Sequence, residues 1–459
     1  MGALTRLGID GATSVALDVR VILFTFAITI ACGLIFGLAP ALRRTTGRIR
    51  GALMEGCTGA SAGRASVRTA SALIIAEVAL ALLLVTAAGL MTRSFLHMRE
   101  VDPGFRTEGA LAVQFTVPST RYQDRDAVLG LQDRIVEALE ARAGIERAGF
   151  VAQLPLTETS WSSQFQAAGW PPDRVGFEIV HRRADVGYFD ALGIPLIRGR
   201  LFEARDHADA PLVVVNETFA RVHFPGEDPI GQRIAYDRTA GPESTWYEII
   251  GIVGDQHQVS PAEAPRAEAF ESRHQDWGRG NWLVLQTTVE PIRMLPVVRA
   301  VLAEVDPLIP IAEARPLNEV WRASMEREEF ILTLLAAFGI VALLLAAVGV
   351  YGVTAQAARR RTRELGIRIA LGARGADVLR LMLRQSMTIV ALGLAAGLAI
   401  SFIATKALST VLFGVPPNDP LTLGIVVAVL GTVAGVACYL PARRALKLDP
   451  VRSLTADSR

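Results

Sequence analysis

The sequence predicts an α-helical membrane protein that carries a large α+β domain outside the bilayer. Hydrophobic residues make up 51% of the 459 residues, and they gather in five separate runs. A long polar stretch, residues 96–325, separates the second run from the third; we call it the outer domain. The clusters of arginine that flank the runs fall on one side of the membrane, as the positive-inside rule requires. These observations exclude an ordinary soluble enzyme.

The apolar runs approach the length of about 20 residues that a transmembrane helix needs. They are residues 21–42, 72–91, 331–353, 388–404 (the weakest) and 421–440. Counting five transmembrane helices places the N-terminus, 95–325 and 405–420 outside, and places 43–68, 354–387 and the C-terminus inside. The chain thus divides into four parts, which are residues 1–69, 70–95, 96–325 and 326–459.

Residues 1–69 hold the first apolar run and a basic linker. At one constant offset Asp18 aligns with Asp419, Pro40 with Pro441 and Arg43 with Arg444, residues that flank the first and the last run. We interpret this agreement as an internal repeat. The alternative is that any two helix exits share proline and arginine. If the repeat is real, run 21–42 is the last helix of a preceding unit.

The outer domain begins and ends with the same pattern. A strand at 111–117, a helix at 124–142 and a strand at 147–154 open it; a strand at 282–287, a helix at 291–304 and a strand at 309–313 close it. We expect one module built from both ends, with an inserted lobe at 155–275 whose strands include 212–215 and 248–253. A helix at 316–329 is expected to continue unbroken into the third run. The domain has no cysteine, so its core alone must hold it together.

The basic loop 354–387 is the second unusual stretch. It has a large excess of arginine over Glu364 and Asp377, and its apolar residues make it amphipathic, while Gly366 and Gly372 divide it into short helices. Two interpretations stay open on these residues alone. The loop rests on anionic headgroups, or it docks a cytoplasmic partner.

Motifs for catalysis or metal binding are missing from the sequence. It has no G-x-x-x-x-G-K-[ST] phosphate loop, no C-x-x-C or H-x-x-x-H spacing and no G-x-S-x-G elbow. We therefore predict no enzymatic activity, no metal site and no cofactor held by this chain. Glu77 is the one acidic residue well inside a span, which makes it a candidate functional carboxylate. A structural role, in reach of water or arginine at the inner end, is the alternative.

Several stretches occur together in the order found in one known family. They are AEVALALLLVTAAGLMTRSF (76–95), YFDALGIPLIRGRLF (188–202), VVVNETFARVHFPGEDPIGQRI (213–234), EIIGIVGD (248–255) and RTRELGIRIALGA (361–373). Through them residues 70–459 resemble the MacB/FtsX-like family of ABC transporter permeases. That family's unit is one span, a large periplasmic domain and three further spans. The extra run 21–42 makes the chain look like the C-terminal portion of a duplicated permease of acidobacterial type.

The resemblance implies an inner-membrane permease subunit, with the outer domain in the periplasm, that transmits movement from a cytoplasmic ABC ATPase for efflux or for extraction of lipid or lipoprotein. ATP would be bound by that separate subunit. The permease would form a homo- or hetero-dimer in the bilayer, with no nucleic acid as partner. The residues implied in ATPase contact are Glu364, Leu365, Gly366, Ile367, Arg368, Ala370, Leu371, Gly372 and Ala373. The alternatives are an FtsX-like signalling or scaffold protein that controls a cell-envelope enzyme, and an inactive truncated permease.

Overall fold

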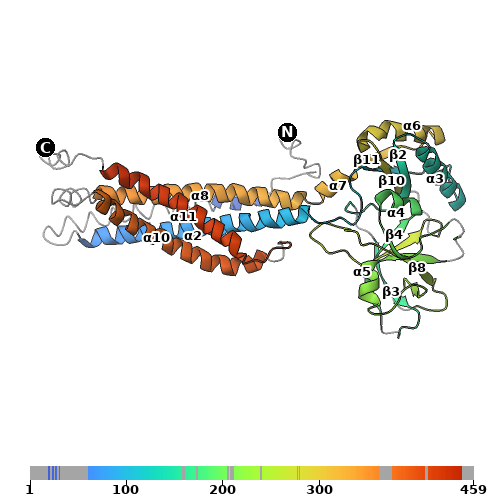
Figure 1. Cartoon of the computed structure of the whole chain (residues 1–459), viewed down its shortest axis with the longest axis horizontal. Helices are drawn as coiled ribbons and strands as arrows, with labels where there is room; N and C mark the ends of the chain where they lie inside the picture. The colour runs from blue at the N-terminus through green and yellow to red at the C-terminus, as the bar shows by residue number, and fades with distance from the viewer. Residues whose placement is uncertain are drawn as a thin grey trace.

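A computed structural model of the chain describes residues 60–360, 375–408 and 412–446, together with isolated residues between 19 and 30; the gaps are 158–160, 172–173, 204–205, 207–210, 238–239, 276–277 and 279. Long helices lie side by side in a rod, and the α+β outer domain sits at one end of it (Figure 1). The rod and the domain thus occupy separate regions, as the distribution of apolar residues predicts.

Four described helices are long and apolar enough to cross a membrane. They are α2 (Ala60–Arg99), α8 (Glu326–Arg360), α10 (Gly375–Leu408) and α11 (Pro420–Leu446). They contain the last four predicted runs, and each extends past the predicted bounds. Most of the first predicted run, 21–42, lies outside the described residues.

The four helices pack around a shared apolar core. Its buried side chains come from all four of them and include Val78, Leu82, Val350, Val390, Val426 and Leu430. Because lipid is as apolar as these side chains, close packing must supply the attraction between the helices. Two glycines of α10, Gly393 and Gly397, allow that packing against α2. A Cβ atom at Gly397 would lie 3.0 Å from Ala79 Cα, and one at Gly393 would lie 2.8 Å from Val78 Cβ.

The outer domain contains the predicted module made from both of its ends. Its strands and helices are β1 (Ala110–Thr116), α3 (Arg125–Glu140), β2 (Ile145–Val151), β10 (Gly280–Thr287), the 3₁₀ turn η2 (Pro291–Met294), α6 (Leu295–Val305) and β11 (Ile311–Pro316). The strand order β11-β1-β10-β2 is antiparallel throughout, so the two strand–helix–strand units interleave. Helices α3 and α6 close one core against this sheet. The prediction is confirmed.

The inserted lobe has more strands than the sequence predicts. They are β3 (Trp161–Ala167), β4 (Gly176–Ala184), β5 (Leu196–Gly199), β6 (Leu212–Asn216), β7 (Arg233–Ala235), β8 (Tyr247–Val253) and β9 (Glu268–Ser272), with helices α4 (Val186–Leu192) and α5 (Glu217–His223). Six of the strands pair in the order β4-β3-β7-β8-β6-β9, and β9 then pairs with β4. The lobe is therefore a closed ring of strands around its own apolar core.

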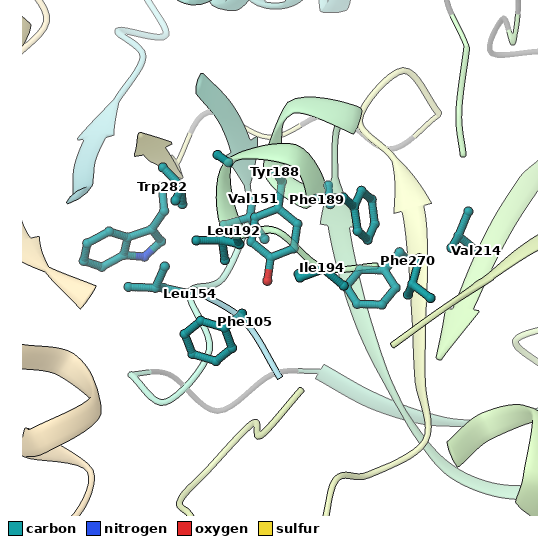
Figure 2. Close-up of a cluster of buried hydrophobic side chains, with 14 of the residues drawn as sticks. Phe105, Val151, Leu154, Tyr188, Phe189, Leu192, Ile194, Val214, Phe270 and Trp282 are labelled. Atoms are coloured by element: carbon teal, nitrogen blue, oxygen red, sulfur yellow. The ribbon is translucent and has the colours of Figure 1, made fainter. Parts of the chain in front are cut away.

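A third apolar cluster of the outer domain joins the module to the lobe. Figure 2 shows Trp282 of β10 on one side, Val151 of β2 with Tyr188 and Phe189 of α4 in the centre, and Phe270 of β9 beyond them. All five are nearly inaccessible to solvent. Because the cluster draws on both parts, module and lobe form one body with a continuous interior.

The connections between this body and the membrane differ from the prediction on one side. Helix α2 runs unbroken to Arg99, but the predicted continuous helix from 316 into the third span is wrong. Helix α7 (Leu317–Ala323) is followed by its C-cap residue Ser324, and α8 begins at Glu326. The Ser324 hydroxyl donates to the carbonyl of Trp321, a local bond that competes with helix continuation. Met325 at the break is buried.

Candidate functional site

The predicted ATPase-contact residues 364–373 lie outside the described residues, but the helices on both sides of them are described. Helix α8 ends at Arg360 and α10 begins at Gly375, both at the end of the rod opposite the outer domain (Figure 1). A small apolar cluster of Ala358, Val378, Met382 and Ala442 packs there. It holds α8, α10 and α11 together at the base of the loop.

Glu77 is half-buried on α2 and faces α8. A Cβ atom added at Gly349 would lie 2.3 Å from Glu77 Oε2, so the glycine leaves the room that the carboxylate occupies. Among the described residues, none forms a hydrogen bond or an ion pair with Glu77. The contact fits both interpretations of Glu77, a packed carboxylate and a functional one, and its role stays a prediction.

A polar contact also joins three helices in the inner half of the bundle. The Thr354 hydroxyl of α8 lies 3.1 Å from Ser386 Oγ of α10 and 3.8 Å from Cys438 Sγ of α11. Polar pairs of this kind add to helix association inside a bilayer. The inner ends of α8, α10 and α11 are thus joined by hydrogen bonds as well as by packing.

At the outer end of the rod an ion pair joins α2 to α11. Arg93 of α2 contacts the Asp419 carboxylate, which also caps α11: Asp419 Oδ2 accepts from the Thr422 amide at 2.8 Å and from its hydroxyl at 2.5 Å. The Thr422 hydroxyl bond and the Arg93 guanidinium lower the pKa of Asp419 to about 2. The carboxylate is therefore charged at any physiological pH.

This lowered pKa predicts a pH-dependent contribution to bundle stability. A carboxyl whose folded pKa lies below its ordinary value of 3.8 stabilises the fold above that value, and loses the contribution as pH falls through about 2. Asp419→Ala should cost about 1–2 kcal/mol at pH 7, through the lost cap and ion pair, and the gap to wild type should close towards pH 2. Denaturant unfolding followed by circular dichroism in detergent measures it. Asp377→Ala, at an exposed carboxylate of α10, is the control; equal losses would contradict the prediction.

The strongest cluster of chemically active side chains in the described chain lies in the lobe. Ser163 of β3, His181 of β4 and Glu271 of β9 line a cavity of about 220 Å³, with Trp161, Ser162, Arg182, Arg183, Gln153 and Tyr236 around them. His181 Nδ1 lies 3.1 Å from Glu271 Oε1, and His181 Nε2 lies 2.5 Å from Ser163 Oγ. Since a carboxylate only accepts, His181 Nδ1 carries a proton and donates it to Glu271.

This chain of three residues has the connectivity of a hydrolytic triad, but hydrolysis also needs donors aimed at a developing oxyanion. The buried cation beside it, Arg182, is committed to Glu268. We therefore assign the cluster no reaction. Burial and the nearby Glu271 carboxylate raise the pKa of Tyr236 well above its ordinary value, so its hydroxyl stays neutral. The sequence does not reveal this cluster, because strand pairing brings together residues that are far apart along the chain.

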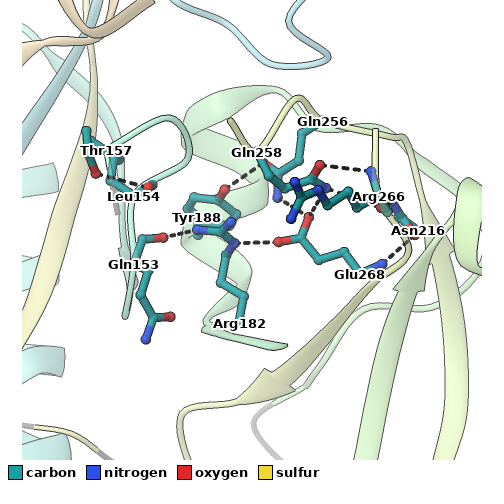
Figure 3. A network of polar contacts seen from close by, with 10 residues as sticks. All are labelled: Gln153, Leu154, Thr157, Arg182, Tyr188, Asn216, Gln256, Gln258, Arg266 and Glu268. Atoms are coloured by element: carbon teal, nitrogen blue, oxygen red, sulfur yellow. Dashed lines mark hydrogen bonds and ion pairs between the residues drawn. The ribbon is translucent and has the colours of Figure 1, made fainter. Parts of the chain in front are cut away.

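Behind the cavity lies a fully buried ion pair. Arg182 Nε donates to Glu268 Oε1 at 2.6 Å, and a second guanidinium nitrogen donates to the carbonyl of Gln153. Glu268 Oε2 also accepts from Gln256 at 2.8 Å and from Gln258 at 3.0 Å. Figure 3 shows this network between the chain after β2 and strands β4 and β9. It fixes the lobe to the module with polar contacts, beside the apolar cluster of Figure 2.

Two family models match the chain. A model of the MacB-like periplasmic core domain matches residues 69–284, and a model of the FtsX-like permease C-terminal matches residues 336–450. Among curated proteins, the chain is 27% identical to a macrolide export ATP-binding/permease protein MacB of Rhodospirillum rubrum, over 68% of this chain and 50% of the relative. It is 27% identical to the pyoverdine export ATP-binding/permease protein PvdT of Pseudomonas putida, over 57% of this chain and 41% of the relative.

The chain thus spans about half the length of the curated relatives it matches. Among solved structures, it is similar to the periplasmic region of MacB from Actinobacillus actinomycetemcomitans, at 15% identity and a TM-score of 0.32, over 48% of this chain and 94% of that one. The two matched segments together take in the outer domain up to residue 284 and most of each of the four described long helices.

Proposed function

Because the chain belongs to the MacB/FtsX-like family of ABC transporter permeases, we propose that it is a permease subunit that couples a cytoplasmic ATPase to its periplasmic domain. It is a multi-pass protein of the inner membrane, and the outer domain is its periplasmic part. In this proposal the chain catalyses no reaction; it transmits movement from the ATPase to the periplasmic domain, which acts on the cargo.

One observation carries this proposal. Helix α2 is continuous over Ala60–Arg99, from the inner end of the rod to the outer domain, and the neighbouring bundle interior is filled with apolar side chains. A rigid helix transmits displacement over its full length, which is about 60 Å for 40 residues at 1.5 Å each. A packed interior leaves no route for cargo between the four described helices. Movement at the inner end therefore reaches the periplasmic domain through the helix itself.

The ATPase contact is proposed for the loop between α8 and α10. Glu364, Gly366 and Leu371 and their neighbours, the residues implied by the family motif, lie between two helices whose ends are packed together. A push on this loop would move α8 and α10 as a pair. ATP would be bound by the separate ATPase subunit, and two permease chains would form the working dimer.

The cargo class follows from the relatives only in outline. The two curated relatives are named as exporters, one for macrolides and one for pyoverdine. We propose export, or extraction of lipid-linked cargo from the membrane, as the function of this chain. In either case the periplasmic domain would act on cargo that is already on the outer side of the bilayer.

The first test is a pull-down between the full chain in detergent and the ABC ATPase subunits of its host. Wild type should retain an ATPase, and Gly366→Arg with Leu371→Asp should reduce retention at least about tenfold, since each introduces a charge into the contact. Phe177→Ala in the periplasmic domain is the control and should bind as wild type. If the double substitution leaves retention of the ATPase unchanged, the loop is not the ATPase contact.

A further inference from the structure

The cavity in the lobe lies at the mouth of the closed strand ring. His181 and Glu271 follow Ile179 and Ala269 by two positions on β4 and β9, so they point to the same face of the sheet as these core residues. Tyr236, just after β7, packs on the same core. The apolar filling of the ring therefore gives way to polar side chains at this end. Barrel mouths are among the common positions of ligand sites.

The polar groups at the mouth are arranged as fixed donors and acceptors. The bonds from His181 to Ser163 and to Glu271 hold all three side chains in place. Gln153 adds an acceptor that nothing uses: the residue is 8% exposed, and its Oε1 has no hydrogen-bond partner among the described residues. Figure 3 shows this side chain turned away from the Arg182–Glu268 network. A buried orphan acceptor costs free energy unless a ligand or water supplies a donor.

An aromatic platform stands beside these groups. Trp161 opens β3 and is 61% exposed, although it lines the cavity. The Arg183 guanidinium lies 5.2 Å from the centre of its ring, which fixes the ring by a cation–π contact. A large exposed indole next to a polar cavity provides a flat apolar surface for one face of a ligand, while the cavity groups bond to its edge.

These features select the class of ligand. Glu271 and Arg183 bring opposite charges to one cavity, so neither a strongly anionic nor a strongly cationic ligand is favoured. Mixed donors and acceptors suit hydroxyl groups, each of which both donates and accepts. About 220 Å³ is below the range of about 300–1,000 Å³ typical of pockets for drug-sized ligands, so the occupant is small. We propose that the mouth of the ring binds a saccharide ring, stacked on Trp161 and hydrogen-bonded to Glu271, Gln153 and Ser163.

This proposal goes beyond the export function and does not depend on it, because binding is measured on the full chain in detergent without ATPase or ATP. The probes are glucose, N-acetylglucosamine and chitobiose. Binding of each sugar is measured by saturation-transfer NMR. Wild type should bind at least one of them, with a Kd on the order of 1 mM. Trp161→Ala should weaken that binding at least about fivefold. Phe177→Ala, which removes another exposed aromatic of the same lobe outside the cavity, should leave it unchanged.

Two further arms complete the experiment. Glu271→Gln keeps the shape of the side chain and should also weaken binding, while the thermal transition of each variant confirms that the domain is folded. Sedimentation with insoluble peptidoglycan separates a polymer from a free sugar: Trp161-dependent sedimentation without binding of the soluble sugars identifies an envelope glycan as the ligand. The proposal is overturned if neither soluble sugars nor peptidoglycan bind, or if Trp161→Ala and Phe177→Ala bind equally well.

Discussion

Glu268→Ala is expected to lower the free energy of unfolding of the periplasmic domain by about 3–5 kcal/mol, because it leaves a buried cation without its counter-ion. Arg182 and Glu268 have no solvent-accessible side-chain surface. After the substitution, Arg182 loses the carboxylate that its Nε contacts, and Gln256 and Gln258 lose the acceptor they share. Both losses occur at the junction of module and lobe. The substitution should therefore lower the stability of the whole periplasmic domain.

The position of the tryptophans gives this experiment a clean signal. All six lie between residues 161 and 321, in the periplasmic domain, so tryptophan fluorescence of the full chain in detergent reports that domain alone. Glu263→Ala is the matched control: its ion pair with Arg266 at 2.7 Å lies on the surface, and its loss should cost at most about 1 kcal/mol. A Glu268→Ala variant as stable as the control would show that the buried pair does not hold the domain together.

Gly397→Leu is expected to separate α10 from α2 and to destabilise the membrane bundle by about 1–3 kcal/mol. A Cβ at this position would meet Ala79 Cα at 3.0 Å and the Ala79 carbonyl at 3.1 Å, and backbone atoms cannot turn aside as a side chain does. The rest of a leucine side chain has no room without a shift of the whole helix. Gly393, one turn earlier, shares the same contact.

The matched control is Gly424→Leu, because a Cβ at Gly424 meets nothing within 4 Å. Unfolding of the bundle in mixed micelles of increasing dodecyl sulfate, followed by circular dichroism, should shift for Gly397→Leu and not for Gly424→Leu. The tryptophan signal of the periplasmic domain should stay the same in both. Equal behaviour of the two variants would contradict the proposed contact between α10 and α2.

The sequence predicts the helices and strands that have long periodic patterns of apolar residues. It does not predict the parts of the fold that depend on pairing between residues far apart along the chain. The two strand–helix–strand units are visible because apolar residues recur along β1 and α3 in the periods of a strand and a helix. The ring of the lobe is not visible: β7 has only three residues, and Ser162, Ser163 and Gln164 interrupt the apolar pattern of β3. The break between α7 and α8 falls at Ser324 and Met325, a position that composition does not reveal.

Some candidate functional residues can be found from the sequence, and others are known only from the folded structure. The loop residues Glu364–Ala373 come from a family motif, and the structure does not describe them. Glu77 is found from the sequence because a carboxylate in an apolar run stands out, but its neighbour Gly349 is known only from packing. Gly393 and Gly397 are four residues apart, a spacing typical of helix contacts in membranes, so a search for small residues at that spacing could have found this contact. The cavity at Ser163 and His181 has no such signal.

The way in which the periplasmic domain is attached limits the loads it can bear. Its entry strand β1 and its exit strand β11 are antiparallel neighbours, with Leu111 opposite Pro316 next to the two membrane connections. A force that drew α2 and α8 apart would act on one end of this pair and peel its hydrogen bonds away one after another. A force along both helices together would load all of them at once. The β1–β11 pair should therefore withstand movement of α2 and α8 in the same direction along their axes, and it should open when the two helices are pulled apart.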